Sequence, residues 1–106
     1  MRQYTTTEQT VKLIALGFPR PKFEIEAQIT DIHGRPQRPV TIIGDYSIGE
    51  LIEMLPTHCN IWDVVDVETG QRKWNVGYIY APSIRRTELV DALYDMIVKL
   101  KEKGVI

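Results

Sequence analysis

The stretch Tyr46–Leu51, which reads YSIGEL, is the clearest structural signal in the chain. Ser47 stands where a helix N-cap is expected, and Glu50 follows at the third helical position, so each side chain can accept a hydrogen bond from the backbone amide of the other residue. Tyr46 precedes the N-cap and Leu51 is the fourth helical residue, a spacing at which the two side chains can pack together across the cap. A helix is therefore predicted to begin at Ser47 and to end before Pro56.

A second helix is predicted nearer the N-terminus. The same capping spacing occurs twice there, in Thr5 with Glu8 and in Thr6 with Gln9, and both alternatives remain open. Gly17 follows the apolar stripe at a position where a left-handed residue commonly ends a helix.

The longest helix is predicted at the C-terminal end, starting near Ser83 or Thr87 and ending at Gly104. Its apolar side chains recur at helical spacing and form a stripe typical of a helix that packs on a core. The stripe consists of Leu89, Leu93, Met96, Ile97 and Leu100.

Two β-hairpins are predicted between these helices. In the first, residues 23–32 form a strand in which the apolar residues Phe23, Ile25, Ala27 and Ile29 alternate with polar ones and make up a dry face. A turn covers residues 33–36, and residues 40–43 form a short second strand. The second hairpin comprises residues 61–67 and 72–80, and we expect the segment Ala81–Ser83 to end its last strand.

The register of the second hairpin depends on its loop. A three-residue loop, Glu68–Gly70, with its glycine in the left-handed conformation, fits a type I turn followed by a bulge. A two-residue loop is the alternative, but it turns Asp63 toward the dry face at a cost of several kcal/mol unless the acid is paired or protonated. We therefore favour the three-residue loop. It pairs Trp62 with Val76, Val64 with Trp74 and Asp66 with Arg72, and it gives Trp74, Val76, Tyr78 and Tyr80 to the core face.

These elements predict a small α+β protein in the order α-ββ-α-ββ-α, with a mostly antiparallel sheet and helices packed on one face. The chain has 106 residues, of which 43% are hydrophobic and 25% charged, and we expect one domain spanning residues 1–106. Cys59 is the single cysteine, so no intramolecular disulfide can form.

The net charge of −1 is the result of three unequal blocks. Residues 1–43 carry +2, residues 44–70 carry −6 and residues 71–106 carry +3. The balance excludes a generic basic coat for nucleic acids. No apolar run approaches the roughly 20 residues that span a bilayer, and residues 1–8 are too polar for a signal peptide, so we expect a cytoplasmic protein.

No catalytic residue, cofactor or metal site is predicted. Ser47 and Ser83 stand at predicted helix starts, where capping accounts for them. His58 and Cys59 are neighbours in the chain, and adjacent side chains usually diverge, so they do not suggest a nucleophilic pair. The sequence contains neither zinc-ligand spacing nor a glycine-rich phosphate loop.

Metal-dependent chemistry is the least favoured alternative, although the central block could supply the ligands. Its carboxylates could converge on a divalent ion, but the segment lacks the Lys or Arg that commonly accompanies such sites. These acids are Asp45, Glu50, Asp63, Asp66 and Glu68.

A non-enzymatic protein-interaction module is the favoured function, with an unknown protein or a second copy of the chain as partner. Val65 and Val67 face outward in the favoured register and are the candidate contacts. The alternative is weak nucleic-acid binding, as an accessory to DNA transactions. A third hypothesis is an acidic mimic of DNA, but a net charge of −1 suits that function poorly. The cations for nucleic-acid binding are Arg20, Lys22, Arg35 and Arg38, and Arg85 and Arg86 are additional candidates.

Four blocks of the chain resemble small uncharacterised proteins encoded by gut bacteria and their prophage-like elements. The blocks are Thr6–Thr10 with Leu16–Gly17, Tyr46–Pro56, Trp74–Tyr78 and Glu88–Tyr94. Residues 23–43 match least well. The resemblance implies a bacterial cytoplasmic or phage-related accessory protein, and it brings no activity, ligand or catalytic residue.

Overall fold

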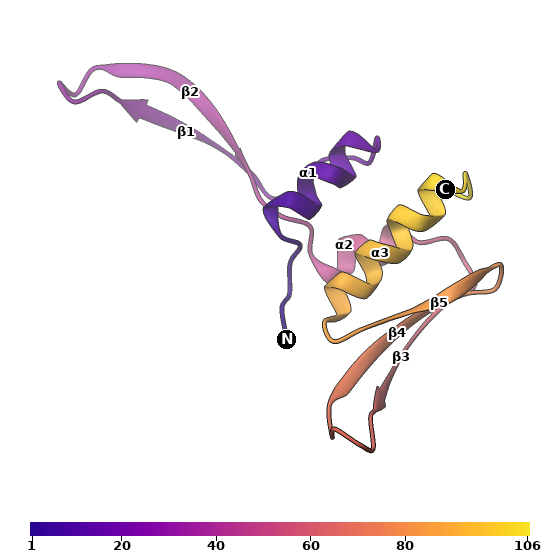
Figure 1. Ribbon diagram of the computed structural model, residues 1–106. Coiled ribbons are helices and arrows are strands. Elements are labelled where there is room, and N and C mark those ends of the chain that lie inside the picture. The colour runs from indigo at the N-terminus through magenta and orange to yellow at the C-terminus, as the bar shows by residue number, and fades with distance from the viewer.

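The computed structural model describes the backbone of residues 1–106 and every side chain outside 25–30 and 37–42. It is an α+β structure with three helices and five strands (Figure 1). The elements are α1 (Thr7–Ala15), β1 (Glu24–Thr30), β2 (Pro36–Ile43), α2 (Ile48–Met54), β3 (Cys59–Val65), β4 (Arg72–Tyr78), β5 (Ala81–Arg86) and α3 (Leu89–Glu102). The predicted order lacked one strand, β5.

The predicted caps of the two N-terminal helices are confirmed. The amide of Glu50 donates to Ser47 Oγ over 3.2 Å, and Glu50 Oε1 accepts from the amide of Ser47, so α2 begins with a complete capping box. At α1 the structure selects Thr6 with Gln9 from the two alternatives. Gly17 has a φ of 98°, the left-handed conformation that glycine adopts without steric cost.

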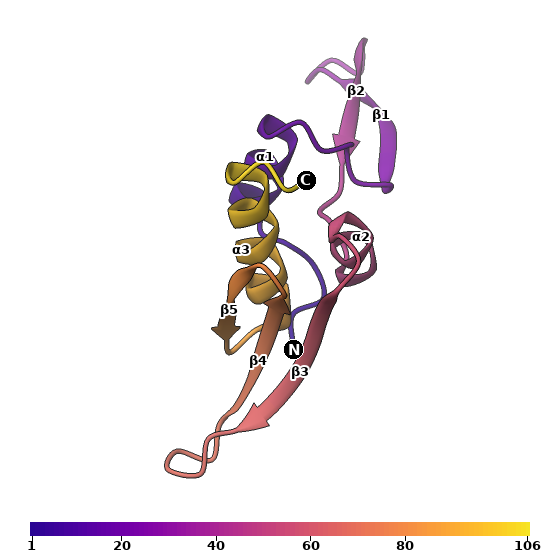
Figure 2. The same cartoon turned by 90° about the vertical axis from the view of Figure 1, so that its right-hand side faces the viewer.

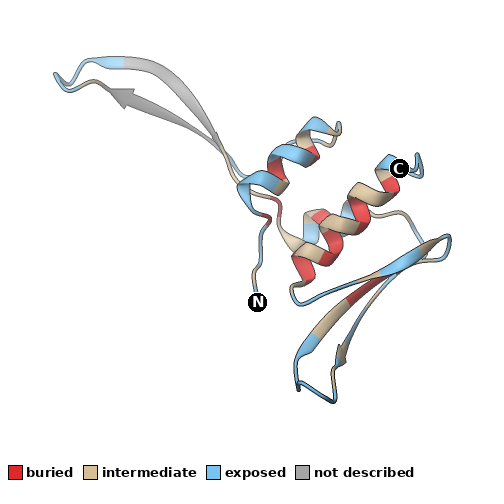
Figure 3. Cartoon of the chain, in the orientation of Figure 1, coloured by how far each residue is buried: buried red, intermediate tan, exposed pale blue. Residues whose placement is uncertain are grey.

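Helix α3 is the centre of the core. Seven of its side chains are buried, and they join buried residues of α1, α2 and β4 in one cluster (Figure 3). The helix starts at Leu89, so of the two predicted starts only Thr87 is close. The buried cluster consists of Leu13, Tyr46, Leu51, Val76, Leu89, Val90, Ala92, Leu93, Met96, Ile97 and Leu100.

Strands β3, β4 and β5 form an antiparallel sheet in that order. Helix α3 contacts β4 and β5, and all three helices lie on one side of the sheet (Figures 1 and 2). The prediction that Ala81–Ser83 ends the strand is wrong, because these residues begin β5. Proline is compatible with an edge strand, and Pro82 lies in one. The chain turns at residues 79–80, so the prediction of Tyr80 on the core face is also wrong, and its side chain is exposed.

The favoured register of the β3–β4 hairpin is wrong by one residue. Trp62 pairs with Asn75, Asp63 with Trp74 and Val65 with Arg72, so the side chains of β3 face as in the two-residue alternative. Neither predicted loop forms, because the amide of Asp66 donates to the carbonyl of Gln71 and the four residues 67–70 lie between them. Asp63 does share a face with the core residues, but its side chain is 44% exposed and forms an ion pair of 3.2 Å with Arg72. The expected cost of burying this acid therefore does not arise.

The strands β1 and β2 pair with each other as an antiparallel hairpin, as predicted. Both differ in extent from the prediction, and β2 begins at Pro36 rather than at Val40. Phe23, predicted on the dry face of the first strand, is exposed. The other members of that face, Ile25, Ala27 and Ile29, lie outside the described side chains.

Candidate functional site

The side of the three-stranded sheet that faces away from the helices is the main candidate surface. We call it the outer face. One row of paired residues crosses all three strands on it, Trp62 on β3, Asn75 on β4 and Arg85 on β5. Alternation along the strands and contact across them add the other members, which are Asn60, Val64, Lys73, Gly77 and Ser83.

Trp62 is the principal side chain of the outer face and is 42% exposed. Its ring lies over Gly77, since a Cβ atom built on that glycine would stand 3.0 Å from Trp62 Cζ3 and 3.2 Å from Ser83 Oγ. A groove of about 380 Å³ opens beside the ring, lined by His58, Asn60, Trp62, Gly77, Tyr78, Ile79 and Ser83.

Asn75 and Arg85 hold each other in place on the outer face. Arg85 Nε donates to Asn75 Oδ1 over 2.9 Å, and this bond ties the guanidinium group to the neighbouring strand. Asn75 is only 2% exposed, and its Nδ2 has no hydrogen-bond partner within the described part of the molecule. Buried amide groups are nearly always bonded, so this one is a donor without its acceptor.

The observed register places Trp62 and Val64 on the outer face, whereas the register favoured from the sequence placed both toward the core. The sequence of β4 indicates which of its residues lie on the outer face. The polar or small residues Lys73, Asn75 and Gly77 alternate there with Trp74, Val76 and Tyr78. That pattern defines an outer face on β4, but it does not say which residues of β3 share it.

The sheet has two edges of different character. On β5, Pro82 lacks an amide proton, and Arg85 and Arg86 add charge, all features that discourage pairing with another strand. On β3 the only charged residue is Asp63, and the strand contains no proline.

The predicted partner contacts Val65 and Val67 are both exposed. Val65 ends β3 and is 57% exposed, and Val67 follows it in the turn. Val65 lies on the same face as the core residues rather than on the outer face. The contact role of both residues stays a prediction.

The predicted cationic residues do not form one surface within the described side chains. Lys22 lies 3.2 Å from Glu53 and its amide donates to Glu50, beside a groove of about 330 Å³ that Arg20 also lines. Arg35 lies in the turn at the other end of β1, about 20 Å of strand away. The side chain of Arg38 lies outside the described residues.

The acids of the central block have separate surroundings. Asp45 accepts from Thr10 Oγ1 over 2.6 Å, Glu50 caps α2, and Asp63 pairs with Arg72. Asp66 does not pair with Arg72 as predicted. It accepts from the backbone amides of Glu68 and Thr69, which lower its pKa. Among the described residues, no three His, Cys, Asp or Glu side chains are grouped to hold a metal ion.

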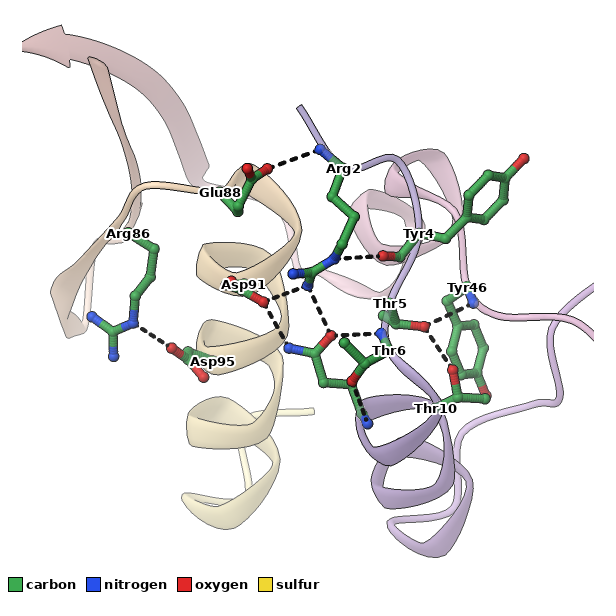
Figure 4. Close-up of polar contacts among 11 residues, drawn as sticks. Arg2, Tyr4, Thr5, Thr6, Thr10, Tyr46, Arg86, Glu88, Asp91 and Asp95 are labelled. Atoms are coloured by element: carbon green, nitrogen blue, oxygen red, sulfur yellow. Dashed lines mark hydrogen bonds and ion pairs between the residues drawn. The ribbon is translucent and has the colours of Figure 1, made fainter. Parts of the chain in front are cut away.

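A polar cluster joins the N-terminal segment to α3 (Figure 4). Arg2 Nη2 lies 2.5 Å from Asp91 Oδ1, and Gln9 Nε2 donates to the same oxygen over 2.8 Å. The amide of Arg2 also donates to Glu88. Burial alone would raise the pKa of Asp91, but the hydrogen bonds from Arg2 and Gln9, with nearby positive charge, lower it. These contacts tie Arg2 and α1 to the first turn of α3.

Cys59 has the opposite character to a catalytic thiol. Burial raises the pKa of the Cys59 thiol, whereas nucleophilic cysteines need a lowered pKa. The neighbouring His58 adopts a left-handed backbone with a φ of 71°.

Comparison of the chain with protein-family models, curated proteins and solved structures finds no match. Among the described residues, no helix is both long and apolar enough to cross a membrane.

Proposed function

We propose that this protein is a non-enzymatic interaction module that assembles through the free edge of β3, with a second copy of the chain as its partner. The observation that carries the proposal is the contrast between the two edges of one sheet. An edge strand presents unpaired backbone N–H and C=O groups, and proteins usually protect such a strand with proline or charge. Strand β5 has both kinds of protection, while β3 has one acid.

The side chains of β3 favour pairing with another copy. Ile61, Trp62, Val64 and Val65 are apolar and suited to a strand. In a symmetric dimer, two copies of β3 would pair antiparallel about a two-fold axis. Because side chains alternate along a strand, the outer faces of the two sheets join only if one residue of β3 pairs with its own copy at the axis. An axis at Asp63 would set two carboxylates opposite each other, which is unfavourable.

An axis at Trp62 avoids that repulsion. It sets the two Trp62 rings opposite each other on the outer face and Cys59 opposite Val65. The result is a six-stranded sheet with all helices on one side, and Val65 takes the contact role that the sequence predicted.

Light scattering after size-exclusion chromatography tests the assembly. We expect a molar mass that rises with concentration toward twice that of one chain. Val65→Lys should keep the protein monomeric, because a lysine on the edge opposes pairing. Val11→Lys is the matched control, since Val11 is 60% exposed on α1 and Val65 is 57% exposed on β3.

Cross-linking tests the register. Directly paired Cα atoms lie about 4.5–5.5 Å apart, a separation that a disulfide can span. Val65→Cys should therefore form a disulfide with Cys59 of the second copy under a mild oxidant and run as a dimer on a non-reducing gel. Val11→Cys should not. A wild-type protein that stays monomeric at every concentration, or a dimer that persists in Val65→Lys, would overturn the proposal.

Nucleic-acid binding is the second candidate function, and the outer face with Arg85 favours it more than Arg20, Lys22, Arg35 and Arg38 do. Arg20 and Lys22 are separated from Arg35 by the length of β1. Arg85, by contrast, lies in the same cross-strand row as the exposed Trp62, with Asn75 between them.

A further inference from the structure

We infer that the outer face of the β3–β4–β5 sheet is a binding site for single-stranded nucleic acid, with a base stacked on Trp62 and the phosphate backbone held by Arg85. The site lies within one chain, so the inference does not depend on the assembly proposed above. It rests on three features of the face, which are an oriented aromatic ring, an imbalance of charge and unused hydrogen-bonding groups.

The ring of Trp62 provides the stacking surface. The ring is partly exposed and lies over Gly77. Because glycine has no side chain, the ring can lie close to the backbone of β4. Stacking of bases on exposed aromatic rings is the common mode of binding single strands, because every base presents a flat π-face. A base in a duplex already stacks on its neighbours and is not available to this ring.

The charge of the outer face is complementary to phosphate. Its eight residues include the cations Lys73 and Arg85 and no acid. The hydrogen bond to Asn75 uses Nε of Arg85. Among the described residues, the two terminal nitrogens of Arg85 have no hydrogen-bond partner. Paired donors of this kind suit phosphate oxygens. Lys73 contributes less, because it also interacts with Asp66 in the turn.

Hydrogen-bonding groups adjoin the ring. Asn60 and Ser83 line the groove beside Trp62, and both are exposed. Asn75 Nδ2 is a buried donor without a partner among the described residues, in the same cross-strand row as Trp62. The groove of about 380 Å³ lies at the low end of the range for small-molecule pockets, and it suits one nucleotide rather than a helix of a partner protein.

Fluorescence anisotropy with a labelled oligothymidylate of about 20 nucleotides tests the site. We expect binding at about 50 mM salt that weakens about three- to sevenfold by about 200 mM, as one or two phosphate contacts to a single strand predict. Trp62→Ala should weaken binding about tenfold, a typical effect of removing one stacking ring. Arg85→Gln should weaken binding and reduce the salt slope by about 0.7, the value for one phosphate contact to a single strand.

Lys103→Gln is the matched control, because it removes the same charge from the exposed C-terminal end of α3. Circular dichroism confirms the fold of each variant, and Trp62→Phe replaces Trp62→Ala if the alanine variant does not fold. The oligonucleotide should also quench tryptophan emission in the wild type and not in Trp62→Phe, in which only Trp74 emits.

Three results would overturn the inference. They are no binding at low salt, equal losses in Lys103→Gln and Arg85→Gln, and a matched duplex that binds as tightly as the single strand. The monomeric variant Val65→Lys should retain binding, so failure of the proposed dimer and failure of this site are distinguishable.

Discussion

Trp62 and Trp74 lie in the same sheet, one residue apart in register, yet they have different surroundings. Trp74 is on the inner face, where it packs against the buried cluster around α3. Trp62 is on the outer face, which no helix covers in Figure 1, and it is half exposed. The amino acid is the same in both places, so the difference comes from the position of α3. An aromatic residue in an alternating stretch therefore indicates a strand, but it does not indicate that its own side chain is buried.

The two faces also divide stability from candidate function. The inner face buries Val76 completely and carries much of the packing, whereas the outer face keeps a polar row with one unsatisfied amide. Packing energy increases with buried apolar area. A surface that retains polar groups and an exposed ring is better suited to a ligand or a partner.

Leu93→Ala should give the largest effect, because it breaks the inner face. Leu93 is fully buried on α3, and removing such a side chain typically costs about 2–5 kcal/mol through lost burial and the cavity left behind. Urea denaturation followed by circular dichroism measures the change. Val11→Ala on the exposed side of α1 should change stability by less than about 0.5 kcal/mol. Equal effects of the two variants would contradict this description of the core.

Gly77→Ala tests the outer face and should have an intermediate effect. The added methyl group would lie 3.0 Å from the Trp62 ring, so the ring or the strand must move. Such overpacking typically costs about 1–3 kcal/mol. The smaller ring of Trp62→Phe should recover part of that cost in the double variant, as a double-mutant cycle would measure. No coupling between the two positions would show that the ring does not rest on Gly77.

Asp91→Asn should give the smallest effect, and it tests how α3 is held from the side opposite the sheet. The pKa of Asp91 is lower in the folded protein than its ordinary value, so the ionised form stabilises the fold above about pH 4. This contribution is lost as the pH falls through the lowered pKa. We expect less than about 1 kcal/mol, because Asp91 and Arg2 are each about one-third exposed.

Unfolding midpoints between neutral pH and about pH 3 measure the Asp91 contribution. The variant should lose part of the acid-dependent destabilisation seen in the wild type. Arg2→Met should have a similar effect, and the double variant should add little to either. Additive losses would mean that the two side chains act independently.

Local signals predicted the helices because their causes lie within a few residues. The capping boxes of Thr6 with Gln9 and Ser47 with Glu50 form within single turns. The buried stripe of α3 follows from its 3.6-residue period. The β1–β2 hairpin was also predicted, although the start of β2 was not.

The errors occurred where distant parts of the chain interact. The predicted register of β3 on β4 is wrong because the observed one was expected to bury Asp63 at a high energetic cost. In the structure the side chain of Asp63 is exposed and forms an ion pair with Arg72. Strand β5 was missed because Pro82 indicated a break, and only the sheet order shows that it lies on an edge. The contacts of Arg2 with Asp91 join residues 89 positions apart and left no local pattern.

The amino-acid sequence by itself determined the α+β class, two helix starts, the core stripe of α3 and the alternation within β4. These follow from hydrogen bonds and side-chain periods that repeat over a few residues. Only the tertiary structure decided that Trp62, Asn75 and Arg85 share one uncovered face and that β3 is the less protected edge. The reason is that pairing register and helix placement depend on contacts between distant segments, and a shift of one residue moves every side chain of a strand to the other face.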